Sequence, residues 1–175
     1  MAIVVLPYDD RWPELFAQVC SELAPIFAGL APAFHHVGST SVPGLAAKPK
    51  IDLHAAFADL ATVAAAVERM QTVAGYTHHG DKYGDESWAF TSGKTYGSRL
   101  YLCTVDNYVL RDRILFRDYL RTHPERADAY AALKLRLMSE ADDDWDYYTG
   151  GKTEFVRETV RLAQLQGLSS LPLKP

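Results

Sequence analysis

Cysteine is scarce in this sequence, since its 175 residues contain only Cys20 and Cys103. Two cysteines in a chain of this length do not form a disulfide framework, so we expect two small, buried thiols. An excess of basic residues is also lacking, because 18 Lys and Arg stand against 22 Asp and Glu, for a formal net charge of −4. Sequence-independent nucleic-acid binding needs a basic face, so we expect no broad nucleic-acid binding, although a local basic pocket remains compatible with this balance.

Long apolar runs are missing too. No stretch approaches the ~20 consecutive apolar residues of a membrane-spanning helix. The first residues show neither the charged start nor the apolar run of a signal peptide. We therefore expect a cytoplasmic protein without a membrane partner. A composition of 48% hydrophobic and 23% charged residues is typical of a globular domain that needs no disulfide or metal to hold its core.

The apolar pattern predicts a single domain over residues 1–168 and a flexible tail at 169–175. Its fold class is α/β or α+β, a mixed sheet flanked by helices with a helical C-terminal third. The first helix should start after Asp9 or Asp10 and be kinked or broken at Pro25. The predicted strands are 3–6, 33–37, 51–57, 87–91 and 99–105, and the predicted helices are 12–30, a segment between Asp59 and Gly75, 108–122, 124–140 and 152–166.

The loop between strands 33–37 and 51–57 carries the strongest functional signal. Gly38 permits a sharp turn, after which backbone N–H groups and the hydroxyls of Ser39, Thr40 and Ser41 can point at an anion. Lys48 can add positive charge to the same phosphate. The alternative is a plain connecting loop, and the segment fits neither the Walker pattern nor the dinucleotide-binding fingerprint.

The strand that follows this loop adds a candidate metal site. Asp52 is a hard oxygen ligand suited to Mg²⁺, and His54 projects from the same face two residues on. A phosphate site beside a metal-binding carboxylate is the basic equipment of nucleotidyl or phosphoryl transfer.

The segment HVGSTSVPGLAAKPKID, residues 36–52, resembles the signature of the GrpB family. Residues 7–12, the helical segment 115–124 and the last helix around Lys152 also resemble that family, so the resemblance spans about residues 3–166. It implies a nucleotidyltransferase-like fold, in some members fused to a dephospho-CoA kinase domain. It also implies that Asp52 is the first member of a metal-binding acidic pair. The resemblance also implies that four further residues line the substrate cleft, namely His36, Arg117, Tyr130 and Lys134.

The sequence departs from the superfamily pattern at the second position of that acidic pair, where His54 stands. Mg²⁺ disfavours imidazole, whereas Mn²⁺ and Zn²⁺ accept it. The later strand carries Tyr101 where the family tends to have His, and it offers no carboxylate. Weaker candidates for a further carboxylate are Asp85, Glu86 and Asp106, and a zinc hydrolase using His36, Asp52 and His54 is a minor alternative.

These observations lead to one main hypothesis and one principal alternative. The main hypothesis is a metal-dependent nucleotidyltransferase that moves a nucleoside monophosphate from a nucleoside triphosphate to an unknown acceptor. Asp52 would be catalytic and would hold Mg²⁺ or Mn²⁺ together with His54. The alternative is a catalytically degenerate regulatory module that binds a nucleotide or a coenzyme A precursor. For the acidic and aromatic segment 142–148, we expect a helix-joining loop with its aromatics on the core, rather than a cation or base site.

Overall fold

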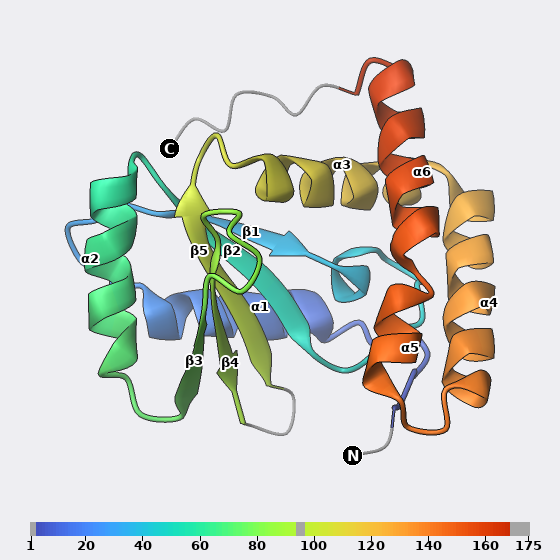
Figure 1. The fold of residues 1–175 in the computed structure, drawn as a ribbon, viewed down its shortest axis with the longest axis horizontal. Coiled ribbons are helices and arrows are strands. Elements are labelled where there is room, and N and C mark those ends of the chain that lie inside the picture. Colours follow the sequence, from blue (N-terminus) through green and yellow to red (C-terminus); the bar gives the residue numbers. More distant parts are fainter. Residues whose placement is uncertain (1–2, 94–96, 169–175) are drawn as a thin grey trace.

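The computed structural model describes residues 3–93 and 97–168, and the tail predicted at 169–175 lies outside these ranges. At its centre is a five-stranded sheet with the strand order β1-β2-β5-β4-β3 (Figure 1). β2 and β5 are parallel, and the other neighbouring strands are antiparallel. The strands are β1 (Ala33–Val37), β2 (Ile51–Phe57), β3 (Tyr76–Gly80), β4 (Trp88–Ser92) and β5 (Ser98–Thr104).

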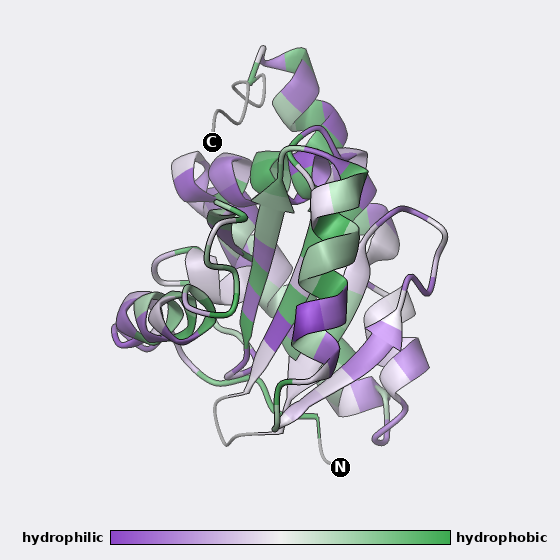
Figure 2. Ribbon diagram, turned by 90° about the vertical axis from the view of Figure 1, so that its left-hand side faces the viewer, coloured by the Kyte–Doolittle hydropathy of each residue, from purple (hydrophilic) through white to green (hydrophobic). Residues whose placement is uncertain are grey.

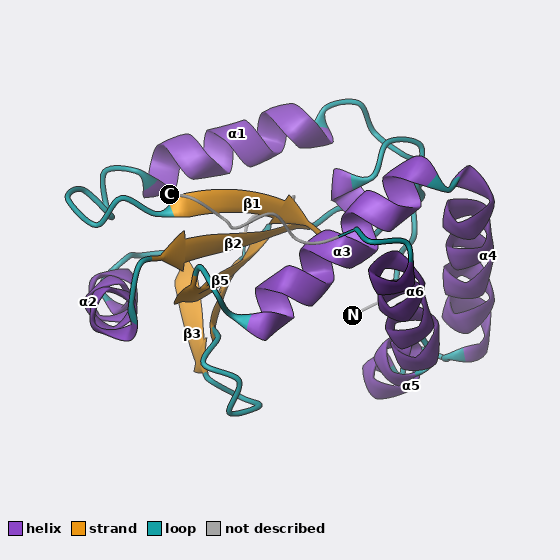
Figure 3. Cartoon of the chain, turned by 90° about the horizontal axis from the view of Figure 1, so that it is seen from above, coloured by secondary structure: helices purple, strands orange, loops and turns teal. Residues whose placement is uncertain are grey.

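Helices cover both faces of the sheet (Figure 3). α1 (Trp12–Leu23) and α2 (Leu60–Gln71) share one core cluster with the odd-numbered residues of β2, such as Leu53. α3 (Tyr108–Thr122) packs on the other face, where Ala56 lies in a second cluster. Side chains alternate along a strand, so Asp52 and His54 belong to the α3 face.

The C-terminal third stands beside the sheet as a layer of helices, α4 (Pro124–Glu140), the short α5 (Trp145–Gly150) and α6 (Thr153–Leu165) (Figure 1). A third core cluster joins α3, α4 and α6 to Val42 and Leu45 of the loop between β1 and β2. This loop is therefore enclosed between the sheet and the C-terminal helices.

Two side-chain caps fix the helices that flank β2. Asp59 accepts a hydrogen bond of 2.8 Å from the Thr62 N–H at the start of α2. Asn107 caps α3 by accepting from two backbone N–H groups, and its Nδ2 donates to the Asp85 carbonyl at 2.8 Å. Figure 2 views the sheet from the side of α2 and shows hydrophobic residues along its central strands.

Most predicted elements are confirmed. The helices at 108–122 and 124–140 and the strands at 33–37 and 51–57 have the predicted bounds. β3 was not predicted, because its sequence Tyr-Thr-His-His-Gly lacks an apolar alternation. None of the described helices is long and apolar enough to cross a membrane.

The break predicted at Pro25 is confirmed, because α1 ends at Leu23 and residues 24–30 form turns; Pro25 cannot continue a hydrogen-bonded helix. Two other N-terminal predictions need correction. The N-cap of α1 is Arg11, which makes no side-chain cap; Asp9 instead binds the backbone and guanidinium of Arg11. The predicted strand at 3–6 is reduced to one bridge between Leu6 and Ala47.

Candidate functional site

The turn after β1 depends on a glycine. Gly38 has φ +72° and ψ −175°, a backbone conformation that is essentially restricted to glycine. A Cβ atom at this position would lie 2.8 Å from the Asp52 Oδ2 atom. Gly38 therefore brings the loop directly against the Asp52 carboxylate, and a 3₁₀ turn over Ser39–Ser41 follows.

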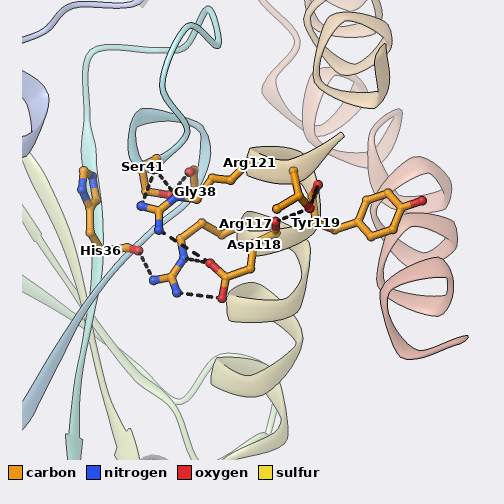
Figure 4. Close-up of polar contacts among 8 residues, drawn as sticks. His36, Gly38, Ser41, Arg117, Asp118, Tyr119 and Arg121 are labelled. Atoms are coloured by element: carbon orange, nitrogen blue, oxygen red, sulfur yellow. Dashed lines mark hydrogen bonds and ion pairs between the residues drawn. The ribbon is translucent and has the colours of Figure 1, made fainter. Parts of the chain in front are cut away.

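Two arginines of α3 hold the end of β1 and the loop after it through backbone carbonyls (Figure 4). Arg117 donates to the His36 carbonyl at 2.9 Å, and Arg121 donates twice to the Ser41 carbonyl at 2.9 and 2.7 Å. Arg117 also pairs with Asp118 at 2.7 Å. The structure thus places Arg117 behind the loop, outside the lining of the cavity described next, whereas the resemblance implied a cleft position.

His36 belongs to the same internal support. Its Nε2 lies 3.0 Å from the Thr40 Oγ1, and its ring stacks on Phe16 with centroids 4.7 Å apart. Burial, together with the charges of Arg121 and Arg117, lowers the pKa of His36 to about 4. His36 is therefore neutral at physiological pH, and its contacts with Thr40 and Phe16 support the loop from the protein interior.

A cavity of about 160 Å³ opens between this loop, the ends of β2 and β5, and the C-terminal helices. Of the residues predicted from the sequence, it brings together Gly38, Ser39, Thr40, Lys48, Asp52, Tyr130 and Lys134. Its charged lining consists of Lys48, Lys50, Asp52, Arg99, Lys134 and Lys152. Among the lining residues that the structure describes, Asp52 is thus the single acidic group facing five basic ones.

Lys134 is the most buried of these cations, with 2% of its surface exposed. Its Nζ donates to the Ser39 Oγ at 3.1 Å and to the Ala46 carbonyl. The Nζ also lies over the Tyr130 ring, 4.7 Å from its centroid. Lys134 therefore points from α4 at the first residue of the 3₁₀ turn.

The positive charges of Lys48, Lys134 and Lys152 repel one another, which disfavours the protonated forms of these side chains. Burial, together with Lys152 and Lys48, lowers the pKa of Lys134 to about 7. Burial and Lys48 lower the pKa of Lys152 to about 8, although Asp52 opposes this shift. An anion placed among these lysines would favour their protonated forms and relieve the repulsion.

Aromatic rings pack against two of these lysines. Lys152 lies over the Tyr148 ring at 4.0 Å, and Lys48 lies over Trp145 at 4.4 Å. The segment 142–148 was predicted as a loop, but the short helix α5 begins at Trp145. Of its aromatic side chains, Tyr148 is buried in a core cluster as predicted, whereas Trp145 and Tyr147 are exposed. This segment contributes cation–π contacts to the cavity, a role that the sequence did not reveal.

The predicted metal ligands do not converge. His54 is fully buried, and its ring nitrogens face Cys103 and Arg113 at 3.4 and 3.2 Å. Within residues 3–93 and 97–168, no three His, Cys, Asp or Glu side chains are grouped to hold a metal ion. The donor set near Asp52 therefore does not fit a two-metal site, and the predicted dependence on Mg²⁺ or Mn²⁺ stays a prediction.

Sequence reasoning missed half of the lining residues, namely Ala47, Lys50, Arg99, Phe116, Tyr148, Thr149 and Lys152. Arg99 lines the cavity because the parallel register of β2 and β5 places it beside Asp52. Lys134 had a detectable signal, because it shares an apolar helical stripe with Tyr130 and Leu137. A lysine in such a stripe is predicted to be buried, and a buried charged group with a shifted pKa in a cleft is a candidate for a functional site.

Comparison with known proteins identifies the family to which this chain belongs. The family model described as GrpB protein matches residues 2–161. The chain belongs to the GrpB family. It is 31% identical over 156 residues to the UPF0157 protein YqkA of Bacillus subtilis, covering 89% of this chain and 45% of YqkA. The chain therefore spans less than half the length of this relative.

Solved structures confirm the fold class. The crystal structure of conserved protein GrpB from Enterococcus faecalis aligns with a TM-score of 0.85 and 27% identity, covering 95% of this chain and all of that one. A chain in the structure of the GLD-2/RNP-8 complex aligns with a TM-score of 0.57 and 11% identity, over 91% of this chain and 61% of that chain. The chain has the nucleotidyltransferase-like fold that the resemblance implied.

Proposed function

We propose that this chain binds the polyphosphate group of a nucleoside triphosphate in the cavity beside Gly38 and Ser39. The observation that carries this proposal is the convergence of five basic side chains around a single carboxylate. Ammonium and guanidinium groups form strong, charge-assisted hydrogen bonds with phosphate oxygens. A ligand with several negative charges would offset the repulsion that lowers the pKa values of Lys134 and Lys152.

The polar groups of the loop indicate how the triphosphate would be oriented in the cavity. Lys134 already donates to the Ser39 hydroxyl, so a phosphate oxygen near that hydroxyl would contact both residues. Lys48 and Lys152 reach the same cavity from the far end of the loop and from the residue preceding α6. The terminal phosphates would therefore sit between Ser39 and the C-terminal helices.

Nucleotidyl transfer to an unknown acceptor is the finer form of this proposal, with Asp52 as the catalytic carboxylate. Support for it comes from the position of Asp52 against Gly38, within the same cavity. Mg²⁺ can be held by one carboxylate together with substrate phosphates, so Asp52 is the residue that would hold it. Binding without transfer, as in a regulatory module, requires only the basic residues and is the function that the geometry supports best.

The first experiment measures thermal unfolding with each of the four ribonucleoside triphosphates and with dephospho-CoA, in chelator, Mg²⁺ or Mn²⁺. A ligand at ~100 times its dissociation constant stabilises the folded state by about 2.7 kcal/mol, which gives a clear shift. We expect stabilisation by triphosphates already in chelator. Absence of any shift in all conditions would contradict the proposal.

Pyrophosphate release separates transfer from binding. With a triphosphate and a pool of small metabolites as acceptors, a transferase releases pyrophosphate and Asp52→Asn abolishes the release. A binding module releases none, and Asp52→Asn retains triphosphate binding. Loss of triphosphate binding in chelator on Asp52→Asn would contradict the role given to the basic residues, because the substitution removes a negative charge from an anion site.

A further inference from the structure

A second cavity of about 220 Å³ adjoins the first. The two cavities share four lining residues, Gly38, Asp52, Arg99 and Phe116. Asp52 and Arg99 therefore stand between two compartments of one cleft. The second compartment lies toward α3, and among the described residues it adds one basic side chain, that of Arg113, and one further carboxylate, that of Asp112.

Arg113 is held by a buried support on the sheet. Its Nη1 lies 3.2 Å from the Nε2 of His54, which is 0% exposed. A guanidinium group can only donate, so the His54 Nε2 accepts and its Nδ1 carries the proton toward the Cys103 sulfur at 3.4 Å. The Arg113 guanidinium also lies over the Tyr101 ring, 4.0 Å from its centroid.

This support explains the histidine at the position where the superfamily pattern has an acidic residue. His54 is neutral, since burial and the charge of Arg113 lower its pKa well below the ordinary value. It stacks on Tyr101 with centroids 4.9 Å apart, so the two rings hold one side of the guanidinium. His54 is therefore a positioning residue for Arg113.

The donors of Arg113 are largely unused inside the protein. Within the described parts of the chain, no carboxylate lies within 4.0 Å of its guanidinium, and its neighbour Asp112 pairs with Arg111 at 3.2 Å. One of its five N–H donors is directed to His54. A rigidly held, half-buried guanidinium with spare donors suits bidentate recognition of an oxyanion.

We propose that the second compartment binds the oxyanion group, a carboxylate or a phosphate monoester, of a second small ligand, with Arg113 as its main contact and Arg99 as its neighbour. The apolar walls Val37, Phe116 and Val156 would contact the carbon skeleton of that ligand. This inference rests on the proposed function, because it assigns the first compartment to the polyphosphate. An acidic co-substrate held there would lie across Asp52 from the phosphates.

Calorimetric titration with two probes tests this assignment. Inorganic phosphate and N-acetylglutamate are each titrated into the full chain carrying Lys134→Met and Lys152→Met, which removes the main phosphate contacts of the first compartment. At least one probe should bind with a stoichiometry near one, and Arg113→Gln should weaken that binding about tenfold or more. Binding of phosphate alone points to a phosphorylated ligand, and binding of N-acetylglutamate alone points to a carboxylic acid.

The matched control is Arg136→Gln, because Arg136 is exposed on α4 and lines neither cavity. It should leave probe binding unchanged. His54→Leu should weaken binding as Arg113→Gln does, whereas His54→Gln, which retains a hydrogen-bond acceptor, should restore most of it. Thermal unfolding of every variant verifies that it is folded.

The proposal is overturned if neither probe binds, or if Arg113→Gln binds both probes as tightly as the parent. The titrations do not depend on triphosphate binding, which is measured separately on the unsubstituted chain. Failure of triphosphate binding with intact, Arg113-dependent probe binding would therefore overturn the proposed function and leave the second site standing.

Discussion

Replacing Gly38 by alanine should damage both the fold and the site, because two effects meet at this position. The backbone conformation, with φ +72° and ψ −175°, is one that L side chains rarely adopt. The added Cβ would also approach the Asp52 Oδ2 to 2.8 Å and the Asp52 Cβ to 3.1 Å. The Asp52 side chain or the loop must therefore move.

The magnitude follows from these two effects. A non-glycine residue in such a backbone region costs about 1–3 kcal/mol. Forcing extra volume into a filled position adds about 1–3 kcal/mol. We therefore expect Gly38→Ala to lower the free energy of unfolding by about 2–6 kcal/mol.

Gly44→Ala is the matched control. Gly44 has φ +80°, but a Cβ there would meet nothing within 4 Å, so it carries only the backbone strain of about 1–2 kcal/mol. Urea denaturation of both variants separates strain from contact. Combining Gly38→Ala with Asp52→Ala, which removes Oδ2, should recover about 1 kcal/mol through coupling of the two sites. Equal losses for Gly38→Ala and Gly44→Ala would refute the close approach between loop and carboxylate.

Three further predictions concern stability and charge. Because the folded pKa of Lys134, about 7, lies below its ordinary value, the unfolded chain binds more protons above pH ~7, so the free energy of unfolding should rise from pH ~7 toward pH ~10. Urea denaturation across that window should show a smaller rise for Lys134→Met, and an equal rise would contradict the assignment. Arg121→Gln removes two hydrogen bonds to the Ser41 carbonyl and should cost about 1.5–3 kcal/mol in the same assay, whereas the exposed Arg111→Gln should cost little. Asp59→Ala removes the cap of α2 and should cost about 1 kcal/mol without changing triphosphate binding, so a loss of binding would show that α2 couples to the cavity.

Much of the fold could be predicted because local patterns determine it. The helix at 108–122 has an Asn cap and an apolar stripe, and the strands at 33–37 and 51–57 are separated by a turn-forming loop. β3 and α5 escaped prediction for the same reason. β3 pairs only as the edge of the sheet, and α5 is a short helix stabilised by the Asp144 cap, so neither shows a long periodic pattern.

The candidate site was predicted less completely, since long-range register determines half of it. The loop residues Gly38, Ser39 and Asp52 could be identified from one continuous segment. Arg99 required the parallel pairing of β2 with β5, and Lys152 required the packing of the C-terminal helices, neither of which the sequence specifies locally.

The position of His54 shows the limit of reasoning from spacing alone. Alternation placed it on the same face as Asp52, which is correct, and suggested a shared metal. Residues two apart on a strand share a face, yet their side chains can serve different neighbours. Here Arg113 of α3 contacts His54, so the His54 side chain supports an arginine.

The most direct test of the central claim is a calorimetric titration of a nucleoside triphosphate in chelator at pH ~6, where Lys134 and Lys152 are protonated. The chain carrying Lys134→Met and Lys152→Met is compared with the unsubstituted chain and with Lys82→Met, which alters an exposed lysine outside the cavity. We predict that the double variant binds at least ~100-fold more weakly, about 2.7 kcal/mol, while Lys82→Met binds normally. Equal affinity in all three proteins would contradict the assignment of this cavity to the polyphosphate.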